Sequence, residues 1–418
     1  MVRQYKESNI SWVGLIPTNW CVLRNKNAFV SGKDLVGKSS STTQLLSLTT
    51  KGIKAIKEGE TSGKVPESYD TYQVVKPNNL VMCLFDLDCS AVFAGISNYE
   101  GMISPAYKVL TCKATIIPQY ANYWFIYVFD GRKFMHYSKN IRYSLTYDEF
   151  SALKIVLPPL NEQKRIADYL DKKCGEIDRL IDLQEQMIAR LAEYKQSVIT
   201  EAVTKGITPE AQLVPSGIDW IGNIPESWQI SKVKWQLRER KEYSENGEEE
   251  PLSMSQKYGL IPTKEMDIIP NMASSFVGAK LVHEGDLVFN KLKAHLGVFA
   301  VSEYNGLVSP DYAVYYKREN SCMKYLEYLF KTPQYIAEFR KLSTGVGAGL
   351  TRLYTNDLFS ISCINPPIQE QEAIAQYIQN KCTEIDNLIA VKQQKIETLK
   401  EYKKSIIFES VTGKKEIS

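Results

Sequence analysis

One phrase occurs twice in this chain of 418 residues. SNISWVGLIPTNW covers residues 8–20 and SGIDWIGNIPESW covers residues 216–228, so that Trp12 and Trp220 are 220 − 12 = 208 residues apart. The same separation returns further along, where Pro158, Glu162, Gln163, Cys174, Ile177, Tyr194 and Thr204 recur as Pro366, Glu370, Gln371, Cys382, Ile385, Tyr402 and Thr412. Twice 208 is 416, so one duplicated unit accounts for almost the whole chain and constrains its architecture. Whatever this protein recognises, we expect it to recognise in two halves.

The two copies are unequally similar. Residues 158–206 and 366–414 align without a gap and share 25 identities in 49 positions, whereas the segments before them are almost unrelated. Within the divergent part, NYEGMISPAY at 98–107 matches EYNGLVSPDY at 303–312, but at a separation of 205 residues. A net insertion of three residues is what surface loops tolerate. One part of the repeat was therefore retained, and another was free to diverge.

The retained part predicts two long helices. Pro158 and Pro159 cannot lie inside a helix, Asn161 is a suitable N-cap, and Glu162 follows in the first turn. Steps of three and four residues, as in a coiled coil, connect Ile177, Leu180, Gln184, Met187, Leu191, Tyr194 and Val198, with Ile385, Leu388, Lys392, Lys395, Leu399, Tyr402 and Ile406 at the same positions of the second copy. We expect the two helices to pair as an antiparallel coiled coil, to hold two domains apart, and to be interrupted near Gly175 in the first copy.

The divergent parts predict a mixed fold of the α/β (α+β) class. Strand-like runs cover residues 73–75, 80–85, 91–96, 107–110 and 154–157 in the first copy and 287–290, 298–301, 313–316 and 359–364 in the second. Amphipathic helices are expected near residues 120–134 and 323–341. The predicted organisation is two globular domains at 1–160 and 208–368, with helical spacers at 161–207 and 369–418.

Composition narrows the class of protein. The longest apolar stretch, residues 80–87, is far shorter than the roughly 20 residues that span a bilayer, and the first residues carry no apolar export signal. Eight cysteines stand singly beside three histidines, which favours reduced thiols over a zinc site or disulfides. We therefore expect a cytoplasmic protein without a metal. The net charge of +3 does not by itself indicate a nucleic-acid binder.

Three short motifs suggest chemistry but lack its context. GKDLVGKS at 32–39 matches the phosphate-loop pattern, yet SSSTT is a poor first helical turn and the second copy has no equivalent. NPPI at 365–368 lacks the aromatic residue with which adenine methyltransferases stack a flipped base. The glycines of STGVGAGL at 343–350 follow no buried strand. With no catalytic residue indicated, the chain is interpreted as a binding protein.

Basic residues mixed with aromatic and amide residues gather in the divergent segments. Arg and Lys neutralise phosphates and can bind guanine edges, while Asn and Gln can bind adenine. Any one such residue is more often a solvated surface charge, but as a set they predict DNA binding. The candidates are Lys38 in the basic loop, Arg132, Lys133, Lys139, Asn140, Arg142 and Tyr143 in the first copy, and Lys291, Lys293, His295, Arg340, Lys341 and Arg352 in the second.

Over essentially its full length the chain resembles the specificity (S) subunits of Type I restriction-modification systems. The resemblance rests on the two W-x-G-x-I-P phrases, the PPLNEQ and PPIQEQ junctions, the I-D-x-L-I steps at 177–181 and 385–389, and EYKQSVITEAVTKG echoed by EYKKSIIFESVTGK. It implies two target recognition domains, each reading one half of a split double-stranded DNA sequence, held apart by the paired helices.

The resemblance also implies a division of labour. The S subunit itself would have no catalytic activity and no cofactor. Two modification (methyltransferase) subunits would dock on the retained helices and methylate adenine with S-adenosylmethionine. Restriction subunits would use ATP and Mg²⁺ to translocate and cleave DNA.

Three alternatives remain open from the sequence. A stand-alone bipartite DNA-binding protein would bind its site without partners. A duplicated coiled-coil adaptor would bind proteins and show no salt-dependent affinity for DNA. A phosphate-loop NTPase built on residues 32–39, the weakest alternative, would depend on Lys38.

Overall fold

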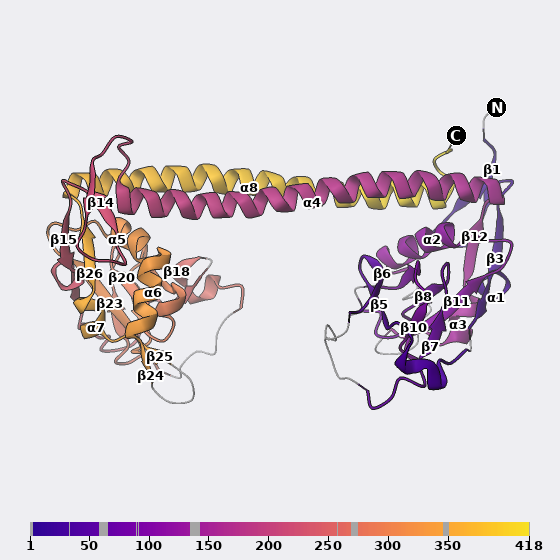
Figure 1. The fold of residues 1–418 in the computed structure, drawn as a ribbon, viewed down its shortest axis with the longest axis horizontal. Coiled ribbons are helices and arrows are strands. Elements are labelled where there is room, and N and C mark those ends of the chain that lie inside the picture. The colour runs from indigo at the N-terminus through magenta and orange to yellow at the C-terminus, as the bar shows by residue number, and fades with distance from the viewer. Residues whose placement is uncertain are drawn as a thin grey trace. The chain divides into compact units, whose positions relative to one another are not determined.

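A computed structural model describes residues 3–32, 34–57, 66–88, 90, 92–133, 143–256, 258–268, 275–345 and 351–417. The chain forms two compact units: unit 1 comprises Met1–Glu185 and Gln393–Ser418, and unit 2 comprises Gln186–Lys392. Each unit contains one α/β globule and half of each of two long helices, α4 (Leu160–Lys205) and α8 (Ile368–Val411) (Figure 1). The expected mixed α/β fold and the two long helices are confirmed. No helix among the described residues is long and apolar enough to cross a membrane.

The globule of unit 1 is built from short elements in a fixed order. They are β1 (Tyr5–Glu7), β2 (Leu15–Pro17), β3 (Cys21–Arg24), α1 (Asn25–Ala28), β4 (Phe29–Ser31), the 3-10 helix η1 (Gly37–Ser41), β5 (Leu46–Thr49), β6 (Gly52–Ala55), β7 (Gln73–Val75), β8 (Leu80–Met82), β9 (Ala94–Ile96), β10 (Gly101–Ile103), β11 (Lys108–Cys112), α2 (Pro118–Asp130), α3 (Tyr147–Ala152) and β12 (Lys154–Leu157).

The globule of unit 2 follows a similar order, with the 3-10 helix η3 (Val233–Trp235) in the place of α1, no helix at the position of η1 among its described residues, and several additional elements. Its elements are β13 (Leu213–Pro215), β14 (Asn223–Pro225), β15 (Gln229–Lys232), η3 (Val233–Trp235), β16 (Leu237–Glu239), β17 (Leu252–Ser255), β18 (Gly259–Pro262), η4 (Thr263–Glu265), β19 (Lys280–Val282), β20 (Leu287–Asn290), η5 (Ala294–Leu296), β21 (Phe299–Val301), β22 (Gly306–Val308), β23 (Tyr312–Lys317), α5 (Met323–Phe330), α6 (Pro333–Leu342), β24 (Thr344–Gly345), β25 (Thr351–Arg352), α7 (Thr355–Ser360) and β26 (Ser362–Asn365).

The sheets of the two units correspond strand by strand. Unit 1 has a four-stranded antiparallel sheet in the order β4-β11-β8-β9, and unit 2 has one in the order β16-β23-β20-β21. The two-stranded pairs β1-β2, β12-β3, β10-β7 and β5-β6 match β13-β14, β15-β26, β19-β22 and β17-β18. The pair β24-β25 belongs to unit 2. The repeat seen in the sequence is therefore a repeat of topology, including the parts whose sequences diverged.

Each unit has an aromatic core that reaches from the sheet to the helices. In unit 1, Trp20, Tyr120 and Trp124 are buried together with Ile166 of α4 and Ile406 of α8. In unit 2, Tyr325, Phe330 and Tyr335 are buried with Val203 of α4 and Ile374 of α8. Because burial of such aromatic side chains dominates core energetics, each globule is fixed to its own helix segments.

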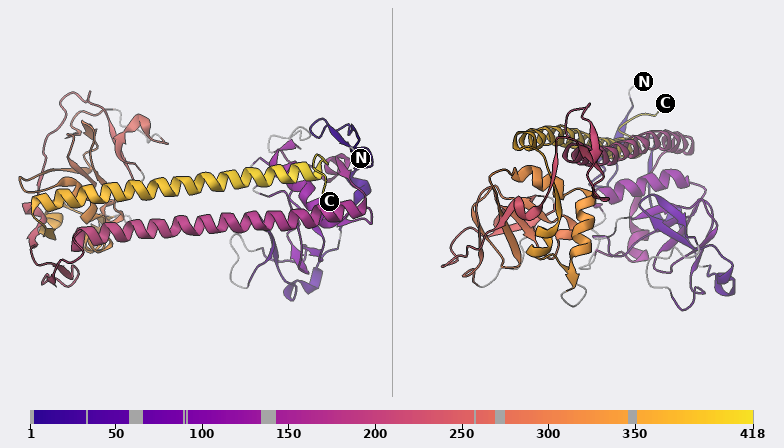
Figure 2. Two further views of the ribbon diagram at one scale, coloured as in Figure 1. Left: turned by 90° about the horizontal axis from the view of Figure 1, so that it is seen from above. Right: turned by 60° about the vertical axis from the view of Figure 1, so that its left-hand side comes forward.

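The two long helices run antiparallel within each unit. In unit 1, Lys403 of α8 forms an ion pair with Asp178 of α4, and in unit 2, Lys195 of α4 forms one with Asp386 of α8. The two views of Figure 2 also show α4 and α8 side by side. The antiparallel pairing predicted from the repeat is confirmed.

The predicted coiled-coil contact positions, here called the seam, are wrong at three of the seven positions in each helix. Leu180, Met187 and Tyr194 are exposed, whereas Ile181 and Ile188 are half-buried. The observed seams are Ile177, Ile181, Gln184, Ile188, Leu191, Lys195 and Val198 in α4 and Ile385, Ile389, Lys392, Ile396, Leu399, Lys403 and Ile406 in α8. These residues step by four and then three, instead of three and then four. Both registers share every seventh residue, so the spacing alone did not separate them.

Two further expectations about helices are corrected. The chain is helical without interruption through Gly175, whose position is open to solvent and imposes no close approach. The single helix expected over 323–341 is two helices, α5 and α6, with Pro333 opening the second. Proline at the first helical position lacks only an N–H that would be unbonded there, so it starts a new helix instead of continuing the old one.

A retained glutamine connects each globule to the start of its long helix. Gln163 Nε2 donates to Pro158 O (2.9 Å) and Thr115 O (3.1 Å), and its Oε1 accepts from Ile117 N (2.9 Å), just before α2. Gln371 makes the equivalent bonds with Pro366 O (2.9 Å) and Cys322 N (2.9 Å), just before α5. These buried bonds explain why the Pro-Pro-x-x-Glu-Gln junction was retained in both copies.

The ends of the long helices are held by a second set of paired contacts. Tyr120 OH donates to Val411 O near the end of α8 (3.3 Å), and Tyr325 OH donates to Val203 O near the end of α4 (3.1 Å). A glycine with positive φ follows each helix, Gly413 against Pro17 and Trp20, and Gly206 against Pro225 and Trp228. The proline and tryptophan of the retained I-P-x-x-W sequence therefore pack against the end of one long helix in each unit.

Candidate nucleic-acid interface

Two of the predicted basic residues come together in unit 2. Arg352 of β25 donates from Nη2 to Asp311 Oδ1 (2.8 Å), and Lys291, directly after β20, donates to Pro310 O (3.5 Å). Leu353 N donates to Lys291 O (3.0 Å), which ties the segment after β25 to the end of β20. Both cations therefore lie at the turn around Pro310 and Asp311.

A third cation of this cluster, Lys280, is not among the residues predicted from the sequence. Lys280 is only 7% exposed, donates from Nζ to Tyr312 O (2.8 Å) and lies 3.9 Å from Glu239. It opens a three-residue strand, and nothing in the neighbouring sequence distinguishes it from a surface lysine. We refer to Lys280, Lys291 and Arg352, together with Asp311 and Glu239, as the unit 2 charge cluster.

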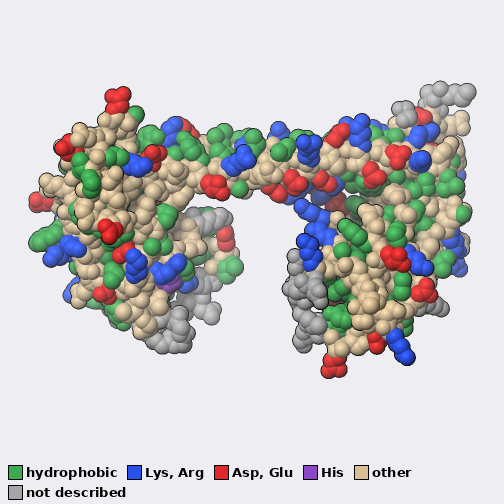
Figure 3. Space-filling view, in the orientation of Figure 1, with side chains coloured by type: hydrophobic (Ala, Val, Ile, Leu, Met, Phe, Trp, Pro, Cys, Tyr) green, Lys and Arg blue, Asp and Glu red, His purple; other side chains and the backbone are tan. Residues whose placement is uncertain are grey.

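The charge cluster holds its lysines at an electrostatic cost. Burial lowers the pKa of Lys291, and the nearby charges of Lys280 and Arg352 lower it further. Burial likewise lowers the pKa of Lys280, although Glu239 and Asp311 act in the opposite direction. Groups of ionisable residues with perturbed pKa values are common at functional sites. In Figure 3, Lys and Arg side chains gather beside a histidine on the globule of unit 2.

The other four predicted residues of unit 2 lie on two neighbouring elements. Lys293 is exposed just before η5, and His295 within η5 has a buried Nδ1 with no hydrogen-bond partner in the described part of the chain. Arg340 and Lys341 are exposed in the last turn of α6, where Lys341 forms an ion pair with Glu338. Because η5 packs on α6, these four cationic or polar side chains occupy one region of unit 2.

In unit 1, four of the seven predicted residues are described. Lys38 is exposed on η1, and Tyr143 is partly exposed. Arg132 donates from Nη1 to Leu87 O and, at 3.0 Å, to Asp88 O. Lys133 lies over the ring of Tyr127 (4.3 Å), and burial lowers its pKa. Lys139, Asn140 and Arg142 lie outside the described residues.

The three short motifs are structural elements or fall partly outside the described chain. The phosphate-loop match at residues 32–39 forms the 3-10 helix η1 from Gly37 onward, whereas a phosphate loop would begin an α-helix there. The strand before it, β4, has only three residues. Asn365 of the NPPI motif accepts a hydrogen bond from Gln371 Nε2 (3.1 Å) at the helix junction. Of the glycine-rich loop, Gly345 lies in β24, and Gly347 and Gly349 lie outside the described residues.

Neither a metal site nor a reactive thiol is indicated by the histidine, cysteine and acidic side chains within the described ranges. No group of three or more His, Cys, Asp or Glu side chains within the described ranges could hold a metal ion. Burial raises the pKa of Cys112 and of Cys363 to about 12, so both remain protonated near neutral pH.

The long helices expose the same apolar positions in both units. Unit 1 presents Leu180, Leu183 and Tyr402, and unit 2 presents Leu388, Val391 and Tyr194. Each residue of one set stands 208 residues from its counterpart in the other set. Hydrophobic side chains are visible along the paired long helices in Figure 3. Clustered exposed apolar residues usually mark an interaction surface.

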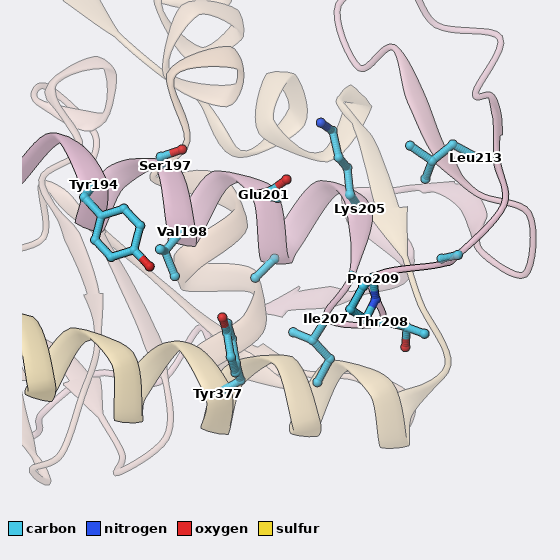
Figure 4. Close-up of a pocket in the computed structure, with 13 residues that line it drawn as sticks. Tyr194, Ser197, Val198, Glu201, Lys205, Ile207, Thr208, Pro209, Leu213 and Tyr377 are labelled. Atoms are coloured by element: carbon cyan, nitrogen blue, oxygen red, sulfur yellow. The ribbon is translucent and has the colours of Figure 1, made fainter.

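A cavity of about 520 Å³ lies beside this surface in unit 2 (Figure 4). Tyr194 of α4 and Tyr377 of α8 point toward each other across it, and Lys205 and Ile207 lie further along. In unit 1 the counterpart of Tyr377 is Tyr169, whose hydroxyl accepts a hydrogen bond from Lys415 Nζ (2.8 Å). The segment after α8 therefore covers in unit 1 a position that is open in unit 2.

Comparisons with known proteins agree on one family. The model of the Type I restriction modification DNA specificity domain matches residues 40–193. The Type I restriction enzyme MjaVIII specificity subunit of Methanocaldococcus jannaschii is 27% identical over 281 residues, which cover 63% of each chain. The putative type I restriction enzyme MjaX specificity subunit of the same organism is 24% identical over 449 residues, which cover 99% of this chain and 98% of that one.

Solved structures share the fold at low sequence identity. One such chain comes from a structural study of complex assembly and conformational transition in the type I R-M system. It superposes with a TM-score of 0.71 at 15% identity, and the match covers 95% of this chain and 98% of that one. The HsdS subunit from Thermoanaerobacter tengcongensis has a TM-score of 0.53 at 15% identity with the same coverage. The repeated α/β globule with long helices is therefore a known architecture.

Proposed function

Because this chain belongs to the specificity subunits of Type I restriction-modification systems, we propose that it selects the bipartite DNA sequence on which such a complex acts. As a specificity subunit it is the non-catalytic DNA-recognition component of such a system. One contrast carries the proposal. The two globules share a topology but have divergent sequences, whereas the helix segments to which they are fixed have retained their sequence.

The contrast suggests a division of roles along the chain. We assign target recognition domains to residues 1–160 and 208–368 and conserved helical spacers to residues 161–207 and 369–418. Each recognition domain reads one half of the split target, and the helices set the distance between the halves. Divergence of the globules then changes the sequence recognised, while the surface offered to partners stays the same.

The DNA-contacting residues include the predicted basic set together with Lys280. In the domain of unit 2, the charge cluster and the region of Lys293, His295, Arg340 and Lys341 offer cations to the DNA. In the domain of unit 1, Lys38, Arg132, Lys133 and Tyr143 are the described candidates, and Lys139, Asn140 and Arg142 complete the set. A net charge of +3 is small for a stand-alone DNA-binding protein, so partner subunits supply further phosphate contacts.

The exposed apolar positions of the helices support two docking sites for identical partners. Unit 1 offers Leu180, Leu183 and Tyr402, and unit 2 offers the same three positions of the repeat, so one partner surface fits both. We assign these sites to two modification (methyltransferase) subunits. Restriction subunits join the same complex. S-adenosylmethionine, ATP and Mg²⁺ belong to those partners, and the complex acts in the cytoplasm.

Partner assembly tests this proposal against the adaptor and stand-alone alternatives. Three variants of the chain are co-purified with the modification subunit: Leu180→Glu/Leu183→Glu, Leu388→Glu/Val391→Glu, and the combination of all four changes. The mass of each complex is measured by native mass spectrometry. Val277→Glu, an exposed apolar position away from the helices, is the matched control. Each double variant should lose one modification subunit, and the quadruple variant should lose both.

DNA binding is measured on the same samples by fluorescence anisotropy at several salt concentrations. The complex should bind duplex DNA with a steep salt dependence and the isolated chain more weakly. Equal affinity of the isolated chain would favour a stand-alone DNA-binding protein, and no salt-dependent affinity of the complex would favour an adaptor.

A further inference from the structure

The backbone correspondence between the units identifies the unit 1 counterpart of Lys280. Strand β19 pairs with β22 through Lys280 and Val308, and β7 pairs with β10 through Gln73 and Ile103. Val308 and Ile103 are 205 residues apart, the separation of the matching motifs in these strands. Gln73 Nε2 donates to Tyr107 O (2.7 Å), just as Lys280 Nζ donates to Tyr312 O (2.8 Å). A neutral amide in unit 1 thus replaces a buried cation in unit 2.

The other members of the charge cluster are also neutral in unit 1. The bond from Leu353 N to Lys291 O corresponds to the bond from Leu145 N to Leu84 O (2.7 Å), which equates Lys291 with Leu84 and Arg352 with Ser144. Asp311 corresponds to Ala106 in the matching motif. Glu239 pairs with Tyr315 in the sheet, as Ser31 pairs with Leu110, so Glu239 corresponds to Ser31. Five charged positions in unit 2 therefore coincide with five uncharged positions in unit 1.

The five charged side chains of unit 2 are not required by the fold, because unit 1 forms the same sheets with uncharged side chains at the equivalent positions. Lys280 is buried and Lys291 is half-buried, and the charge of Lys280 lowers the pKa of Lys291, so this arrangement costs free energy. Local arrangements that cost stability without serving the fold are expected at functional sites.

We propose, on the basis of the proposed function, that Arg352 and Asp311 read one G·C base pair in the half-site bound by unit 2, with Lys280 and Lys291 as positioning residues. In the major groove, guanine presents the acceptors O6 and N7 to Arg, and the paired cytosine presents its N4 amino group to a carboxylate. The equivalent positions of unit 1 hold Ser144 and Ala106, so the half-site of unit 1 is read without this pair.

The geometry of the two side chains suits this role. The side chain of Asp311 is 62% exposed and that of Arg352 is 26% exposed, so both are accessible. Their 2.8 Å bond uses one Nη2 hydrogen and one carboxylate oxygen, which leaves Nη1 to donate and Oδ2 to accept. Arg352 Nε is buried without a partner in the described part of the chain. The bond to Asp311 and the burial of Nε restrict the guanidinium before DNA arrives, and this restriction lowers the entropy cost of binding.

The test uses the chain co-expressed with its modification subunit, and the readout is the motif of N6-methyladenine found by sequencing genomic DNA. Arg352→Ala, Asp311→Ala and Arg352→Lys are compared with the unmodified chain. The control is Arg238→Ala, an exposed position on β16 that points to the opposite face from Glu239. Methylation is also measured on duplexes that carry each base pair at the affected position.

Arg352→Ala and Asp311→Ala should relax one G·C position in one half of the motif, with a loss of discrimination of roughly 10- to 100-fold, while the other half and the spacing stay unchanged. Arg352→Lys should relax it less. Arg238→Ala should leave the motif intact. If an alanine variant does not fold, the soluble Arg352→Lys variant decides the question.

Two outcomes overturn the inference while leaving the proposed function intact. One is a split motif that all folded variants methylate unchanged. The other is a split motif whose unit 2 half, identified by exchanging residues 208–368, contains no G·C pair. If the unmodified chain directs no split motif at all, the proposed function itself fails, and the inference fails with it.

Discussion

Lys403 Nζ lies 2.6 Å from Asp178 Oδ1 and joins α8 to α4 within unit 1. In unit 2 the same pair occurs with the helices exchanged, because Lys195 of α4 lies 2.7 Å from Asp386 Oδ2 of α8. The two lysines and the two aspartates are each 208 residues apart. Each long helix therefore carries both members of the pair, and a single duplicated sequence specifies antiparallel pairing in both units.

Charge reversal at this pair tests its contribution to helix pairing. Asp178→Lys should destabilise unit 1 by about 1 kcal/mol or less, because both side chains are partly exposed. Asp178→Lys combined with Lys403→Asp should recover most of the loss. Urea unfolding of the two single variants and the double variant gives the coupling, and a coupling of zero would show that the pair does not hold the helices.

Glycine substitutions should have opposite effects at two positions. Gly175→Ala should raise the stability of α4 by about 0.5–1 kcal/mol, because the position is helical and open. Gly413→Ala should destabilise the protein, because φ is +74° and the added Cβ would lie 2.4 Å from Pro17 Cδ. Thermal unfolding checks both, and a loss of stability in Gly175→Ala would contradict the uninterrupted helix.

Replacing the junction glutamine should loosen one globule from its helix. Gln163→Leu removes bonds to Pro158 O, Thr115 O and Ile117 N, and the unpaired buried groups should cost about 1–3 kcal/mol. Gln371→Leu should cost a similar amount in unit 2. Exposed Gln196→Leu is the control, and hydrogen exchange at the start of α2 or α5 would localise the effect. An effect no larger than that of the control would refute the role of the junction.

Cations that contact phosphates should be recognisable by salt dependence. Lys293→Ala and Arg340→Ala should weaken binding of the assembled complex to all DNA sequences alike and reduce the slope of log K against log[salt] by about 1 each. The methylated motif should not change. A changed motif would instead assign the residue to base reading.

The sequence predicted the architecture because its strongest signals are duplicated. Trp12 and Trp220, the Pro-Pro junctions and the helical spacing each occur twice, so that an error in one copy is corrected by the other. Strand limits were exact at 154–157 and 287–290. The seam failed because residues such as Leu180 and Ile181 are both apolar, and only the partner helix decides which one is buried.

Residues that are identical in the two copies can also have different hydrogen-bond partners, and the spacing of the sequence repeat does not predict these differences. Trp20 Nε1 donates to Glu162 Oε2 (3.0 Å), and Glu162 also pairs with Arg3. Trp228 Nε1 is buried without a partner in the described ranges, and Ala211 replaces Arg3 in the repeat. Of the predicted basic residues, Lys291 and Arg352 meet only because β20 and β25 converge, and Lys280 joins them through a strand pairing remote in sequence.

The most direct test of the central claim is the methylome of cells that express this chain with its modification subunit, compared with cells that express the modification subunit alone. We predict a new N6-methyladenine motif of two short halves with a fixed gap. Exchange of residues 21–157 for those of a relative should change one half and leave the other half and the gap intact. Co-purification of the two proteins without any new methylated motif would contradict the claim that this chain selects DNA sequence.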